Sequence, residues 1–143
     1  MIRKKLLGLA GLALVLLPAI TLSSEATSLK DIMQGLRNDL VEIADGLLMD
    51  DFEQVARGAI AIAEHPRIPA DQVQLVAQEL GPEMPAFKQI DTVVHDLSLK
   101  IHAAAEAHDR DAAITAYQQM IEGCFGCHAA YKERVALVLQ EVP

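Results

Sequence analysis

The sequence predicts an all-α protein, an antiparallel up-down-up-down bundle of four helices. In four long segments, apolar residues recur every three or four positions, which is the spacing of one helix face. Prolines and glycines separate these segments. No segment alternates apolar and polar residues as a half-buried strand does. Four amphipathic helices with short links bury their apolar faces best against one another, which favours a bundle.

The first predicted helix begins at Ser28. Asp31 follows three residues later, which resembles a capping box with Asp in place of the usual Glu or Gln. The apolar face of this helix consists of Leu29, Ile32, Met33, Leu36, Leu40, Ile43, Leu47 and Leu48. The second helix begins near Asp51, with Gln54 at the capping-box position, and ends before Pro66, which cannot continue a helix.

An irregular stretch is expected between residues 66 and 85. Residues 71 to 80 are expected to form a short helix there, which a glycine and two prolines then end. The third long helix is predicted from about 86 to 107. The fourth begins near Asp111, and its expected apolar face consists of Ile114, Tyr117, Ile121, Cys124, His128, Tyr131 and Val135.

The N-terminus has the pattern of a secretory signal. Three basic residues precede an apolar run from Leu6 to Ile20, and the small residues Ser24 and Ala26 offer cleavage after Ala26. The run is shorter than a membrane-spanning helix requires, although an uncleaved anchor stays open. We therefore expect residues 1–26 to be a signal peptide and residues 27–143 to be one domain, placed in the periplasm, with no transmembrane segment in the mature chain.

The net charge of the chain limits the classes of partner that it can bind. The full chain has a net charge of −8; without residues 1–26, nine basic residues stand against nineteen acidic ones, a net charge of −10. Such a surface argues against binding nucleic acid or anionic membranes, and it favours a partner with a basic docking surface. An acidic surface that serves solubility alone is the other interpretation.

Residues 123–132, GCFGCHAAYK, contain both cysteines of the chain, with His128 directly after the second. Cys-x-x-Cys-His is the attachment signal for covalent c-type haem: the two thiols add to the haem vinyl groups as thioethers, and the imidazole binds the iron. A reactive dithiol needs a helix N-terminus to stabilise its thiolate, whereas Cys124 is expected deep inside a helix. A structural zinc site needs four ligands, and only three lie together.

This motif near the C-terminus, on the last helix of a four-helix protein, resembles the class II c-type cytochromes, the cytochrome c′ family. The resemblance covers most of residues 28–135; it is most specific in GCFGCHAAYK and also present in IMQGLRNDL of the first helix. The resemblance implies an up-down-up-down bundle with one haem c, Cys124 and Cys127 as attachment points and His128 as the proximal iron ligand.

The family includes sites whose iron has only the proximal His and sites closed by a Met from the first helix. Met33 matches that Met, so the chain most resembles the low-spin members of the family, the cytochrome c-556 type. In an antiparallel bundle, Met33 and His128 are expected nearly level across the core, and a thioether suits haem iron. A flexible core methionine is the alternative. The pocket lining is expected to include Ile32, Leu36, Ile121 and Tyr131.

The function that the sequence predicts is electron transfer by an extracytoplasmic monohaem cytochrome, an electron carrier and not an enzyme. A redox partner protein is expected, and a homodimer is left open. Two alternatives stay open. A five-coordinate haem would bind nitric oxide or carbon monoxide, and an exported thiol–disulfide protein would use Cys124 and Cys127 as a dithiol.

Overall fold

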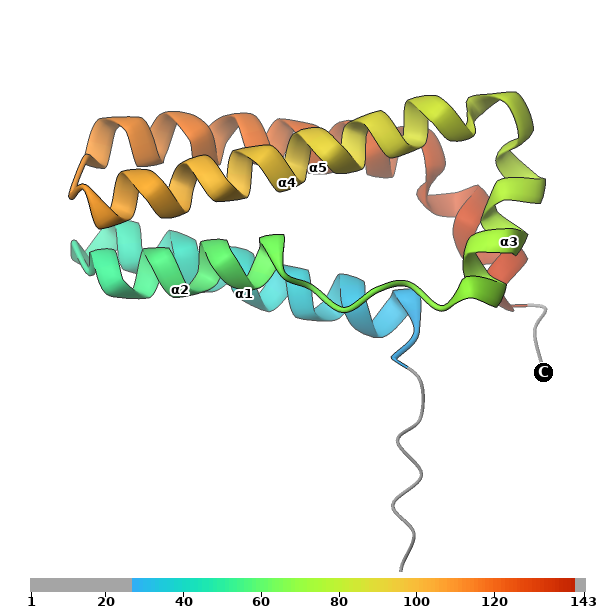
Figure 1. The fold of residues 1–143 in the computed structure, drawn as a ribbon, viewed down its shortest axis with the longest axis horizontal. Helices are drawn as coiled ribbons and strands as arrows, with labels where there is room; N and C mark the ends of the chain where they lie inside the picture. The colour runs from blue at the N-terminus through green and yellow to red at the C-terminus, as the bar shows by residue number, and fades with distance from the viewer. Residues whose placement is uncertain (1–26, 141–143) are drawn as a thin grey trace, which may run out of the picture.

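A computed structural model describes residues 27–140 of the chain (Figure 1). The predicted signal peptide, residues 1–26, lies outside the described residues. Within them the chain forms five α-helices and one 3₁₀ turn and no strand, which confirms the all-α prediction. The elements are α1 (Leu29–Met49), α2 (Phe52–Ala63), α3 (Ala70–Leu80), η1 (Gly81–Glu83), α4 (Met84–Glu106) and α5 (Arg110–Gln140).

The helix starts follow the capping signals of the sequence. The Ser28 side chain accepts from the backbone N–H of Asp31, and the Asp31 carboxylate accepts from the backbone N–H of Ser28 at 3.0 Å, a complete capping box. At α2, the Asp51 carboxylate accepts from the backbone N–H of Gln54 at 2.9 Å. The Gln54 side chain does not complete that box; it donates instead to the Asp45 carboxylate on α1 at 3.0 Å.

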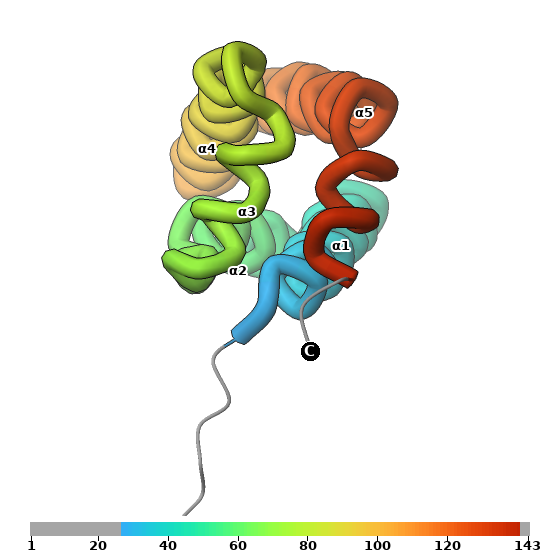
Figure 2. Tube along the Cα trace, turned by 90° about the vertical axis from the view of Figure 1, so that its right-hand side faces the viewer, coloured from blue at the N-terminus to red at the C-terminus, as the bar shows by residue number. Residues whose placement is uncertain are grey.

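Four helices pack against one another as the predicted up-down bundle. Viewed along its length, α1, α2, α4 and α5 stand at the corners of a square, and α3 crosses one end (Figure 2). Contacts are extensive between α1 and α2, between α2 and α4, and between α4 and α5. Neighbouring α1 and α5 pack only loosely. The fourth side of the bundle is therefore less closed than the other three.

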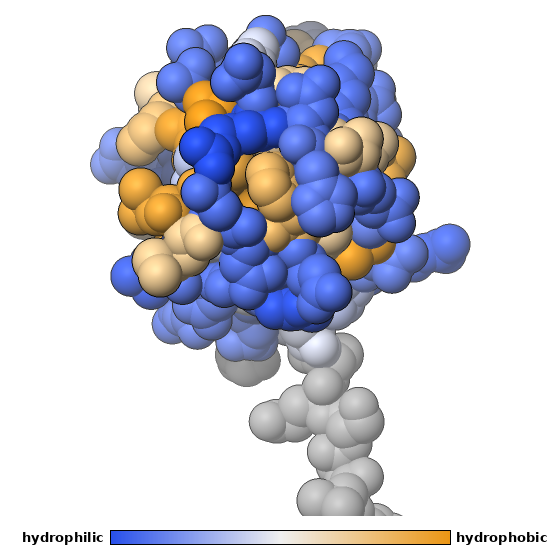
Figure 3. All heavy atoms as spheres, turned by 90° about the vertical axis from the view of Figure 1, so that its left-hand side faces the viewer, coloured by the Kyte–Doolittle hydropathy of each residue, from blue (hydrophilic) through white to orange (hydrophobic). Residues whose placement is uncertain are grey.

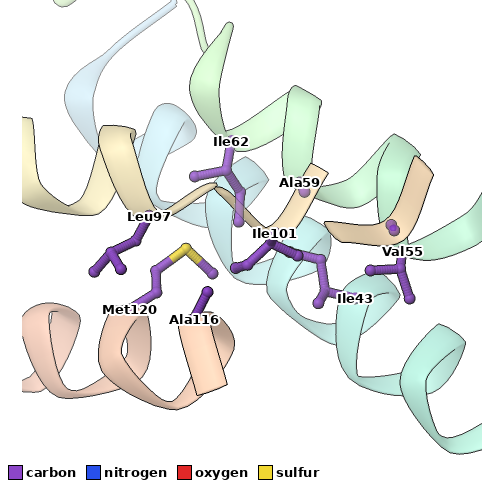
Figure 4. Close-up of a cluster of buried hydrophobic side chains, with 9 residues drawn as sticks. Ile43, Val55, Ala59, Ile62, Leu97, Ile101, Ala116 and Met120 are labelled. Atoms are coloured by element: carbon purple, nitrogen blue, oxygen red, sulfur yellow. The ribbon is translucent and has the colours of Figure 1, made fainter. Parts of the chain in front are cut away.

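The buried side chains form two separate clusters. The first cluster lies between the four helices in the half of the bundle away from α3, where side chains of all four meet (Figure 4). Its buried members are Ile43, Val55, Ala59, Ile62, Leu97, Ile101, Ala105, Ala116 and Met120. The second cluster lies toward α3 and consists of Leu29, Val76, Leu80, Tyr131 and Val135. The last turns of α5 bend toward the start of α1 and bring these residues together (Figures 1 and 2).

The apolar face of α5 differs from the expectation because α1 and α5 pack loosely. On α5 the buried positions are Ala113, Ala116, Met120, Tyr131 and Val135, whereas much of the predicted stripe is only half-buried. Apolar side chains also reach the surface at the end of the bundle where α1 turns into α2 (Figure 3). None of the helices within residues 27–140 has both the length and the apolar character needed to cross a membrane.

Candidate functional site

The two cysteines lie deep inside α5, as predicted. Cys124 is fourteen residues after Arg110, the first residue of the helix, or about 21 Å along its axis at 1.5 Å per residue. Both cysteines are half-buried and neither forms a disulfide. The dipole of the helix N-terminus does not extend this far, because the effect falls off within the first turn.

The cysteines lie at the boundary between the two apolar clusters. Cys124 packs against the first cluster, and Cys127 packs against the second. Gly123 lets α4 approach at this point, since a Cβ there would come within 3.2 Å of a methyl group of Val94. A helix turn that carries two thiols thus joins two apolar regions of the bundle interior.

The surroundings of the thiols hold them in their neutral form. Burial raises the pKa of the Cys124 thiol above its ordinary value. Burial, and then the nearby charges of Asp91 and Cys124, raise the pKa of Cys127. Reactive cysteines of disulfide exchange have the opposite property, a lowered pKa next to a helix N-terminus or a cation. The position and the pKa of this pair therefore disfavour a dithiol enzyme.

His128 is exposed, which corrects the expectation that it lies on the buried face of α5. It follows Ile121 by seven residues, so it lies on the same side of α5 as Ile121, which borders the groove to α1. Because α1 and α5 pack loosely, this face is only partly covered. Among residues 27–140, the histidine hydrogen bonds and ion pairs belong to His65, His95 and His102, and none engages His128.

Met33 is 40% exposed, so the expectation that it lies on the buried stripe of α1 is wrong. Its neighbour Ile32 takes the buried position instead. Met33 precedes Arg37 by four residues and Leu40 by seven, so it lies on the face of α1 that borders α5. The side chain is exposed for the same reason as His128: the helix opposite does not close over it.

A hydrogen bond crosses the loosely packed side between α1 and α5. The Tyr117 hydroxyl donates to the backbone carbonyl of Leu40 at 3.3 Å. Met33 lies seven residues before Leu40, and Cys124 lies seven residues after Tyr117. Since the helices run antiparallel, Met33 lies along this side in the direction of the cysteines and His128.

Of the four residues predicted to line the haem pocket, three pack in the interior of the bundle and one lines the groove between α1 and α5. Ile32 is buried, and Leu36 packs against the first cluster. Tyr131 is buried in the second cluster, where its ring meets Phe87 edge-on with centroids 5.4 Å apart. Only Ile121 lines the groove between α1 and α5.

That groove has a volume of about 410 Å³ and mostly apolar walls. Its walls are formed by Arg37, Leu40, Val41, Ala44, Asp45, Leu48, Tyr117 and Ile121. The sequence did not single out Val41, Ala44 or Asp45, because they fall outside the apolar stripe of α1. The feature of the sequence that these three residues share is that they flank the apolar stripe on the side of α1 toward α5. Within the described part of the chain, no three His, Cys, Asp or Glu side chains gather to hold a metal ion.

Compared with protein-family models, with curated proteins and with solved structures, the chain matches none.

Proposed function

We propose that the protein is an extracytoplasmic monohaem c-type cytochrome that transfers electrons. The observation that carries the proposal is the position of Cys-x-x-Cys-His: the motif lies in the middle of α5, and its two cysteines contact the two apolar clusters on either side. A haem is a large apolar plate, so an attachment point between two apolar regions suits it.

The residues present fit a covalent haem in three respects. Both thiols are free and partly accessible, as addition to vinyl groups requires. His128 is not engaged by another described side chain. The groove between α1 and α5 has mostly apolar walls, and its wall residue Ile121 lies three residues before Cys124. The charge of Arg37 at the groove also suits the carboxylate of a propionate.

Each residue has a distinct proposed role. Cys124 and Cys127 would each form a carbon–sulfur bond to a vinyl group, with the thiol hydrogen passing to the neighbouring vinyl carbon. His128 would bind the iron through one ring nitrogen, and Met33 would supply a second ligand to it. When bound, the haem supplies a one-electron Fe(III)/Fe(II) couple, with a potential that Met ligation raises. The net negative surface would orient a redox partner with a basic docking surface.

One observation supports the gas-binding alternative. Met33 is 40% exposed rather than enclosed between α1 and α5. If it does not bind the iron, that position would be open to nitric oxide or carbon monoxide. The raised pKa of both thiols, by contrast, gives the thiol–disulfide alternative no support.

The test is to produce the full chain in a bacterial host that attaches c-type haem. The mature protein should keep its haem through acid–acetone extraction, gain the mass of one haem, and contain no free thiol. Cys124→Ser and Cys127→Ser should each shift the reduced spectrum, because each leaves one vinyl group unreacted. Extraction of all haem from the wild type, or a haem-free protein with two titratable thiols, would overturn the proposal.

A further inference from the structure

Two apolar side chains protrude at the end of the bundle where α1 turns into α2. Leu48 is 82% exposed and Met49 is 71% exposed, the two highest values among the large apolar residues of the described chain. Both lie in the last turn of α1. Apolar patches stand among polar atoms on this end of the molecule (Figure 3). Adjacent apolar side chains with a polar rim are typical of a surface that another molecule covers.

The turn between α4 and α5 belongs to the same surface. Two contacts hold it against the turn between α1 and α2. Arg110 forms an ion pair with Asp50, and the ring of His108 meets that of Phe52 with centroids 4.9 Å apart. The side chains of both turns therefore face the same partner.

This end of the bundle is strongly acidic. Residues 45–53 and 106–112 contain seven carboxylates and one arginine, a net charge of −6 out of the −10 of residues 27–143. All seven carboxylate side chains are exposed: Asp45, Asp50, Asp51, Glu53, Glu106, Asp109 and Asp111. We call these seven residues, together with Leu48 and Met49, the acidic end.

Helix structure explains only part of this charge. Asp51 and Asp109 begin α2 and α5, where their carboxylates accept hydrogen bonds from backbone N–H groups at 2.9 and 3.0 Å. The C-terminus of a helix prefers a basic residue, and neither α1 nor α4 has one in its last turn. Asp50 and Glu106 stand at these two ends instead. Carboxylates at positions that the helix dipole disfavours point to a role outside the fold.

The charge decides what can cover Leu48 and Met49. A second copy would bring a like charge of −6 against the first, and an anionic membrane would be repelled in the same way. Like charges that meet across an interface cost affinity. A basic surface is complementary when it also offers an apolar side chain, because interfaces combine an apolar centre with a polar rim.

We propose that the acidic end docks a protein segment in which Lys and Arg side chains flank apolar ones. Leu48 and Met49 contact the apolar side chains, and the surrounding carboxylates pair with the basic ones. The proposal does not rest on the haem. Arg110 lies at this end, about 21 Å along α5 from Cys124, so a partner bound here leaves the cysteines uncovered. The acidic end therefore anchors the protein without closing the candidate site.

The experiment measures the dissociation constant of the mature protein for a synthetic amphipathic helix of lysine and leucine, by isothermal titration calorimetry at low and physiological salt. A peptide of the same composition in scrambled order is the control for charge alone. The amphipathic peptide should bind more tightly than the scrambled one, because only its leucines face the protein together. Its affinity should fall as the salt concentration rises.

Two double variants separate the apolar and the ionic contributions. Leu48→Gln/Met49→Gln keeps the charge and removes both apolar contacts, so it should weaken binding of the amphipathic peptide about tenfold or more. Glu53→Gln/Asp111→Asn removes two charges and should weaken binding severalfold at low salt and less at physiological salt. All four side chains are exposed, so the fold should be kept, which circular dichroism checks.

A matched control locates the effect. Glu133→Gln/Asp71→Asn removes the same two charges from exposed positions toward the opposite end of the bundle and should leave the affinity unchanged. Equal affinities for the two peptides, an unchanged affinity in Leu48→Gln/Met49→Gln, or an equal loss in this control overturns the proposal. Self-association, or binding to zwitterionic lipid vesicles, that Leu48→Gln/Met49→Gln abolishes also overturns it, since a second copy or a membrane would then cover the surface.

Discussion

Met33→Ala tests whether Met33 is the sixth iron ligand, and Met120→Ala is its matched control. Both substitutions truncate the same side chain, on α1 and on α5. Met120 is fully buried in the first cluster, whereas Met33 is 40% exposed on the side of α1 toward α5. Only Met33 is proposed to bind iron. The two variants therefore separate loss of packing from loss of a ligand.

The structure sets different stability costs for the two changes. Full burial of a Met side chain contributes about 1.5–3 kcal/mol, so the partly exposed Met33 contributes about 1–2 kcal/mol, and alanine is a better helix former. Met33→Ala should thus lower the free energy of unfolding of the haem-free protein by about 1 kcal/mol. Met120→Ala leaves a cavity in a closed core and should cost about 2–5 kcal/mol.

The assay is the absorption spectrum of the haem-loaded protein, oxidised and reduced, with and without carbon monoxide. Met33→Ala should convert a low-spin spectrum to a high-spin one that responds to carbon monoxide, whereas Met120→Ala should keep the wild-type spectrum in spite of its larger stability loss. A high-spin wild type would favour the gas-binding function, and an unchanged low-spin spectrum in Met33→Ala would show that another side chain is the sixth ligand.

The remaining predictions concern the thiols and the surface charge. Cys124→Ser/Cys127→Ser should stay helical by circular dichroism but melt at a lower temperature and less cooperatively than the haem-loaded protein, because the region between the two clusters is left unfilled; equal melting curves would contradict this. In the haem-free wild type, burial raises both thiol pKa values above those of the unfolded chain, so its stability should fall as pH rises past the ordinary thiol pKa; the double Ser variant should lack this fall in pH-dependent urea unfolding. Electron transfer with a basic partner should slow as ionic strength rises, perceptibly so between low and physiological salt; rates that do not change with salt would assign the acidic surface to solubility alone.

The elements of the fold were predictable because their signals are local. Ser28 and Asp31 cap α1 with their own side chains, and Asp51 begins α2 in the same way. The prolines after residue 65 end α2 where a ring without an N–H cannot continue a helix. Around Pro82 and Pro85, α4 begins two residues earlier than expected because Pro85 fits the first turn of a helix. The other boundaries within residues 27–140 differ from the expected ones by one or two residues.

The position of the candidate site along α5 was equally local, since a motif of five residues and the helical spacing around it place both cysteines deep inside the helix. The environment of the cysteines, by contrast, depends on helices that are remote in the sequence. Periodicity fixes the angles between side chains on one helix, but it does not say which neighbouring helix comes close. His128 and Met33 fit their apolar stripes by spacing and are nevertheless exposed, because α1 and α5 pack loosely.

The sequence by itself thus determined the helices, most of their ends and the place of Cys124, Cys127 and His128 inside the last helix, all of which depend on residues a few positions apart. Only the tertiary structure decided that the core divides into two clusters, that the cysteines lie between them, and that a groove runs between α1 and α5. The reason is that burial depends on the distance between helices remote in sequence. That distance follows from the packing of all four helices together, and no single stripe encodes it.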